Sequence, residues 1–113
     1  MTKERIEQIA DKNGWKVFWD DGYAEFEKYS PAGEDFIFTV DTTDEESIIP
    51  AIYDYAYIYY DADEHAEEWI KARDESATGV PDLRTLIEDA DAIQDMLREF
   101  CDVLKEEGGY YYV

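Results

Sequence analysis

Hydrophobic residues at the start of the chain recur every three or four positions. This spacing predicts a helix over Lys3–Lys12, because side chains three and four residues apart share one face of a helix. Thr2 is placed to cap the first turn, and Asn13-Gly14 is a typical helix end. The residues expected on the buried face are Ile6, Ile9 and Ala10.

The pattern then changes to an alternation of hydrophobic and polar residues, which is typical of strands with one buried face. Turn sequences separate the alternating segments. Asp20-Asp21-Gly22 favours a hairpin, and Ser30-Pro31-Ala32-Gly33 fits a type I turn. Three strands are therefore expected to pair in order as an antiparallel meander. They are Trp15–Trp19, Tyr23–Tyr29 and Phe36–Val40.

Helical spacing returns after Asp41. Thr43 with Glu46 is a capping-box pattern, and it opens a helix that we expect to continue through Tyr60. Pro50 lies inside this segment and predicts a kink. The alternative is a strand, because tyrosines occupy every second position here. These tyrosines are Tyr53, Tyr55, Tyr57 and Tyr59.

Two further helices are expected. Asp61 with Glu64 resembles a capping box and opens the first, over Ala62–Arg73, with Trp69 on its buried side. Asp74–Gly79 is predicted to be a loop.

The last helix opens near Pro81 and has the most regular spacing in the chain. One helix as far as Gly108-Gly109 would be roughly 37 Å long, which exceeds a compact domain of this size. A break near Asp89-Ala90-Asp91 is therefore expected, with a single continuous helix as the alternative. The hydrophobic positions are Leu83, Leu86, Ala90, Ile93, Leu97, Phe100 and Leu104, of which Leu86, Ile93 and Leu97 are expected in the core. The predicted fold class is α+β: one domain over residues 1–113, in the order α-β-β-β-α-α-α, with the helices on one face of the meander.

The chain is strongly acidic. Thirty Asp and Glu residues oppose ten Lys and Arg, for a formal charge of -20, yet 45% of the residues are hydrophobic and a core can form. No Lys or Arg lies between Tyr29 and Ile70, whereas twelve carboxylates do. Such a field repels nucleic acid and anionic membranes and suits a basic partner protein.

The sequence contains no motif that predicts a catalytic reaction. The single histidine, His65, lies among carboxylates that should raise its pKa, but one His does not define a metal site, and an exposed helix face is the expected setting. The EF-hand pattern that begins at Asp61 fails at its later positions. Cys101 is expected to be a buried structural thiol. We therefore expect no enzyme activity, no cofactor and no metal. With one cysteine, no long apolar run and no signal-like N-terminus, a cytoplasmic monomer or homodimer is expected.

Three segments carry a resemblance. These are Glu25 to Phe36, Asp63 to Trp69 and Gly79 to Arg84. They resemble small acidic uncharacterised proteins encoded on phages and conjugative elements of gut bacteria. The resemblance implies an antirestriction-like protein that mimics DNA, and it transfers no catalytic residue.

The function expected from the sequence is a non-enzymatic acidic binding protein. It would occupy the basic, nucleic-acid-binding surface of a partner, which could be a nucleic-acid-binding enzyme. The alternative is a general interaction or accessory module that uses exposed tyrosines, with the charge serving solubility. Halophilic adaptation and a small enzyme are further readings. The expected contact residues are Asp44, Glu45, Asp54, Tyr55, Tyr57, Tyr59, Asp61, Asp63, Glu64, Glu67 and Glu68.

Overall fold

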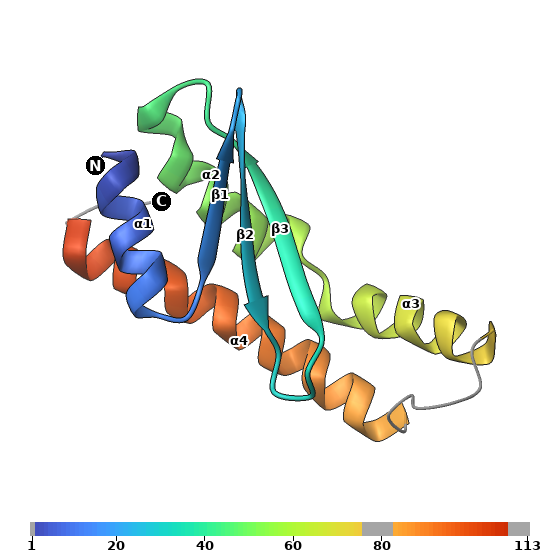
Figure 1. Ribbon diagram of the computed structural model, residues 1–113. Coiled ribbons are helices and arrows are strands. Elements are labelled where there is room, and N and C mark those ends of the chain that lie inside the picture. The colour runs from blue at the N-terminus through green and yellow to red at the C-terminus, as the bar shows by residue number, and fades with distance from the viewer. Residues whose placement is uncertain (1, 76–82, 109–113) are drawn as a thin grey trace.

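The computed structural model describes residues 2–75 and 83–108. A three-stranded antiparallel sheet in the order β1-β2-β3 carries helices on one face, so the predicted α+β class and element order are confirmed (Figure 1). The described part of the chain measures 44 × 27 × 23 Å along its principal axes. None of its helices is long and apolar enough to cross a membrane.

Helix α1 spans Lys3–Lys12, as predicted, and the Arg5 amide donates to Thr2 Oγ1 at 3.1 Å. Asn13 caps its C-terminus. Gly14 follows with φ of +86°, a left-handed conformation that glycine adopts without a Cβ clash.

The strands are β1 (Lys16–Asp20), β2 (Tyr23–Tyr29) and β3 (Asp35–Asp41). The first begins one residue later than predicted, because the Trp15 amide donates to the Ala10 carbonyl at 2.8 Å and so belongs to the connection from α1. The third extends one residue further at each end than predicted, since Asp35 and Asp41 both pair with β2.

The predicted helix over residues 43–60 consists of three parts. A 3₁₀ turn η1 (Glu45–Ser47) leads into α2 (Ile48–Asp54), and a π-helical turn η2 (Tyr55–Tyr59) follows. The strand alternative is wrong, and so is the capping box. Asp44 rather than Thr43 accepts the first free amide, that of Glu46 at 3.1 Å. Pro50 lies in the first turn of α2, where its missing N–H costs no hydrogen bond, and the helical geometry changes only later, at Tyr55.

Helix α3 covers Ala62–Glu75, so Asp74 and Glu75 are helical and not part of the predicted loop. Helix α4 covers Leu83–Gly108 without interruption, and the expected break near residues 89–91 is wrong. A helix of this length is accommodated because α4 has two packing partners along its length. Its first half packs against α3, which runs antiparallel to it, and its second half lies across the sheet (Figure 1). The predictions for residues 76–82, including Pro81, and for Gly109 lie outside the described residues.

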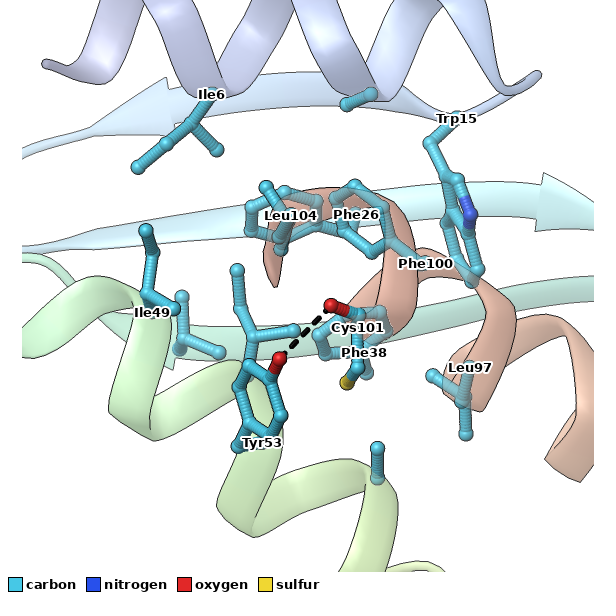
Figure 2. Close-up of a cluster of buried hydrophobic side chains, with 14 of the residues drawn as sticks. Ile6, Trp15, Phe26, Phe38, Ile49, Tyr53, Leu97, Phe100, Cys101 and Leu104 are labelled. Atoms are coloured by element: carbon cyan, nitrogen blue, oxygen red, sulfur yellow. Dashed lines mark hydrogen bonds between the residues drawn. The ribbon is translucent and has the colours of Figure 1, made fainter. Parts of the chain in front are cut away.

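The main core lies between the sheet and helices α1, α2 and α4. Phe26 and Phe38 stack at 5.1 Å, Trp15 stacks on Phe100 at 5.5 Å, and the Tyr53 hydroxyl donates to the Cys101 carbonyl at 2.9 Å (Figure 2). The expected burial of Leu86, Ile93 and Leu97 is confirmed, each being at most 1% exposed, whereas the side chain of Trp69 lies outside the described part. A second, smaller cluster of Ala62, Ala66 and Ala90 joins α3 to α4.

Candidate functional site

The eleven residues predicted for partner contact do not form one surface. Asp44 and Glu45 lie at the start of η1, and the carboxylate of Asp44 is engaged in capping it. Asp54 is half-buried at the end of α2. The other predicted residues divide between the π turn and the first two turns of α3. The tyrosines are Tyr55, Tyr57 and Tyr59, and the carboxylates are Asp61, Asp63, Glu64, Glu67 and Glu68.

We call these five carboxylates the α3 carboxylates. All five are exposed, and within residues 2–75 and 83–108 none of them forms an ion pair with a lysine or arginine. Asp61 has a structural task as well. Its Oδ1 accepts the amides of Asp63 and Glu64 at 3.0 and 3.3 Å, which confirms it as the N-cap of α3. The side chains of the other four accept no hydrogen bond within the described residues, and the charge of Glu68 contributes to the raised pKa of His65.

The π turn separates the three predicted tyrosines. Tyr57 stacks on Tyr53 at 6.1 Å, and the guanidinium of Arg98 from α4 lies 4.9 Å from its ring centroid. Tyr55 instead stacks on Phe38 at 4.7 Å and is half-buried. Tyr59 is 71% exposed. Tyr57 therefore contacts α4, whereas Tyr55 contacts the sheet.

A shallow cleft of about 210 Å³ lies where the π turn meets α3. We call it the tyrosine cleft. The π turn places rings along it, because the Tyr60 amide donates to the Tyr55 carbonyl at 2.8 Å, five residues back. Carboxylates on one side of α3 also line it, since residues 61, 64 and 68 are three, four and seven positions apart. Its lining is Tyr55, Tyr59, Tyr60, Asp61, Glu64 and Glu68, together with His65.

His65 also has a specific partner that sequence reasoning missed. Its Nε2 lies 2.8 Å from Oε2 of Glu34, which comes from the turn between β2 and β3, and both side chains are largely buried. The expected exposed setting is therefore wrong. The expected rise of its pKa is confirmed: the hydrogen bond to Glu34 raises the pKa, burial opposes the rise, and Glu34, Glu68 and Asp89 add charge that raises it further. No spacing in the sequence connects residues 34 and 65.

The same turn is fastened to α4 by a buried carboxylate. Asp89 is 3% exposed, its Oδ2 accepts the Ser30 hydroxyl at 2.6 Å, and its Oδ1 accepts the Ala32 amide at 2.9 Å. Ser30 Oγ in turn accepts the Glu34 amide at 2.9 Å. The sequence contains one sign of this contact. Asp89 lies three residues after Leu86 and next to Ala90, so a charged residue falls on the hydrophobic face of α4. Its partner could not be read from that position.

Neither a metal-binding cluster nor an exposed thiol is found among the described residues. Among residues 2–75 and 83–108, no three His, Cys, Asp or Glu side chains are grouped so that they could hold a metal ion. Cys101 is buried, as expected, and burial raises the pKa of its thiol to about 12. A thiol in that state is a poor nucleophile near neutral pH.

No protein-family model, curated protein or solved structure matches this chain. A function has to be inferred from its own residues and their geometry.

Proposed function

We propose that this protein is a non-enzymatic acidic binding protein that occupies the basic, nucleic-acid-binding surface of a partner protein, in the manner of a DNA mimic of the antirestriction type. The observation that carries the proposal is the set of α3 carboxylates. They are exposed, they lack basic partners within the described residues, and they lie in a stretch of sequence without Lys or Arg.

The spacing of these charges supports mimicry of a phosphate array. Residues 61 to 68 are separated by seven helical steps of about 1.5 Å, so five carboxylates occupy about 10.5 Å of axis. Four intervals over this length give about one charge per 2.6 Å, which is of the same order as the one charge per roughly 1.7 Å of duplex DNA. A basic surface shaped to neutralise phosphates would therefore meet a similar charge density.

The fold supports the presentation of this array. The Asp61 cap and the packing of Ala62 and Ala66 against Ala90 hold α3 against α4, so its charged side is displayed by a fixed helix. Figure 1 shows that α3 and the start of α4 extend beyond the end of the sheet, where a partner can approach. The proposal includes action in the cytoplasm as a monomer or homodimer, without direct binding to nucleic acid.

The test compares two sets of four neutralised carboxylates on different helices. The first is D63N/E64Q/E67Q/E68Q on α3. The second is D95N/E99Q/D102N/E106Q on α4, whose residues are likewise exposed and form no ion pair within the described part. Asp61 is left intact because it caps α3. Both sets change the net charge equally, so any difference reports position.

The wild-type chain is first used to retain basic proteins from host extract, and these are purified. Competition between this protein and labelled duplex DNA for each purified partner is then measured across a salt series. We expect this protein to displace DNA, with an affinity that falls as salt rises. The α3 set should weaken binding on the order of tenfold or more, since exposed pairs contribute up to about 1 kcal/mol each, and the α4 set much less. A partner without a basic surface, or equal loss in both sets, would refute mimicry.

A second candidate is an interaction module that uses exposed tyrosines, because Tyr59 is 71% and Tyr57 47% exposed. Tyrosine is enriched among residues that dominate binding energy. In that case the Y57A/Y59A variant loses the partner, whereas salt and the α3 set have little effect. The same salt series therefore separates the two functions.

A further inference from the structure

We propose that the tyrosine cleft is a receptor for one cationic side chain of the partner, with a guanidinium as the preferred group. This inference rests on the proposed function, because it names the contact by which an acidic protein would hold a basic one. In addition to the combined negative charge of the α3 carboxylates, the partner would then contact one defined pocket.

The cleft is lined by two kinds of acceptor for a cation. One is the set of three tyrosines, Tyr55, Tyr59 and Tyr60, which we call the aromatic wall, and the other is the set of three carboxylates, Asp61, Glu64 and Glu68. A guanidinium is attracted by aromatic rings and also donates hydrogen bonds to carboxylates, so it suits both kinds of lining. An anion or a neutral apolar group would satisfy at most one of them.

The aromatic wall is held in place before any ligand arrives. Tyr55 is stacked on Phe38 at 4.7 Å, and the Tyr60 hydroxyl donates to the Ala90 carbonyl at 3.1 Å. Fixed rings lower the entropy lost on binding. Tyr59 is left exposed beside them and can close over a ligand.

The π turn is the device that assembles this wall. In an α-helix the residue one turn onward is about four positions away, whereas the bond from the Tyr60 amide to the Tyr55 carbonyl spans five. The longer turn brings Tyr60 over Tyr55 and leaves Tyr59 alongside. π turns are uncommon and are found frequently at functional sites, which agrees with a binding role here.

Size and charge select the ligand. About 210 Å³ is smaller than the roughly 300 Å³ at which pockets for drug-sized molecules begin, so the cleft suits a single side chain rather than a nucleotide or cofactor. His65 also lines it, but its ring is hydrogen-bonded to Glu34, whose carboxylate compensates a charge on the imidazole. The net field of the cleft therefore remains negative.

The probe is N-acetyl-L-arginine amide, titrated into the full chain at 0.15 M salt and followed by NMR shifts of the Tyr59, Tyr60 and His65 amides. We expect saturable shifts there. The citrulline analogue, which has nearly the same shape without the charge, should give none. Y59A should weaken binding about threefold, from the strength of exposed cation–π contacts, and Y59F should retain it.

E64Q/E68Q should weaken the probe about fivefold to tenfold. Its matched control is D95N/E99Q, an equally spaced and exposed pair on α4, which should leave affinity within about twofold. Equal binding of citrulline, or equal loss in both pairs, would overturn the cleft. If the probe fails while DNA competition persists, the cleft is wrong and the mimic stands. If the probe binds while competition fails, the mimic is wrong and the cleft stands.

Discussion

Replacement of Asp89 by alanine is expected to destabilise the fold far more than loss of any exposed carboxylate. Asp89 lies in the second turn of α4 and is 3% exposed. Its two oxygens accept the Ser30 hydroxyl and the Ala32 amide at 2.6 and 2.9 Å. The turn between β2 and β3 is thus attached to the helix by two hydrogen bonds to one carboxylate.

The magnitude follows from those two bonds. Hydrogen bonds to a charged group contribute about 1.5–3 kcal/mol each. The lost contribution is reduced because Ala32 is exposed and its amide can bind water, and because alanine raises helix propensity by about 0.6 kcal/mol. Ser30 is 5% exposed and would keep a hydroxyl with a poorer partner. We expect a net loss of about 2–4 kcal/mol in the free energy of unfolding.

Urea denaturation measures this loss, with Asp91→Ala as the matched control. Asp91 is exposed, lies two residues away on the same helix, and undergoes the same change of side chain and charge. That control should shift stability by no more than about 0.5 kcal/mol. A Ser30→Ala variant completes a double-mutant cycle, in which we expect a coupling of about 1–2 kcal/mol between positions 30 and 89.

Two results would contradict the expected role of Asp89. If Asp89→Ala and Asp91→Ala differ by less than about 0.5 kcal/mol, the buried carboxylate does not anchor the turn. If the cycle shows no coupling, Asp89 acts through some contact other than Ser30.

Four further predictions concern the rest of the molecule. Leu97→Ala should cost about 2–5 kcal/mol in urea unfolding, because Leu97 is 0% exposed, whereas Ile87→Ala, at 46% exposed, should cost little. The folded-state pKa of His65 is raised, so the stability contributed by its bond to Glu34 is present below about pH 6.5 and is lost as pH rises through the raised pKa. NMR titration of the His65 ring and unfolding across pH check this, and an unshifted titration contradicts it. Cys101 should resist a thiol reagent until the protein unfolds, since burial raises its pKa to about 12. The denaturation midpoint should rise from low to moderate NaCl as salt screens self-repulsion, and a fall would count against it.

Local patterns in the sequence predicted most of the elements. Alternation over Tyr23–Tyr29 gave that strand its observed bounds, and the spacing of Ile6, Ile9 and Ala10 with Thr2 did the same for α1. These signals succeed because they depend only on the period of the backbone and on which face is buried.

Features that depend on tertiary partners could not be predicted in this way. The long α4 was expected to break because its length was judged against a compact body, and nothing in its own residues shows that α3 would cover its first half. The bond between Glu34 and His65 joins the turn between β2 and β3 to helix α3, two segments that are distant in sequence. The π turn was not predicted either. The spacing of the tyrosines indicated a helix, with a strand as the alternative, and does not distinguish a π turn from an α-helix.

The structure also separates carboxylates that composition treats alike. Asp44, Asp61 and Asp89 accept hydrogen bonds that hold the fold together, whereas Glu67 and Glu68 lie beyond the first residues of α3 and accept no hydrogen bond within the described residues. These two charges repel the other carboxylates, so neutralising them should leave the free energy of unfolding unchanged or raise it at a pH where His65 is neutral. Where His65 is charged, loss of Glu68 also removes a favourable interaction, because Glu68 raises the pKa of His65. If the same change weakens partner binding, those two charges serve recognition at some expense to stability. If it leaves binding intact, their role is solubility, and the tyrosines become the better account of how this protein contacts its partner.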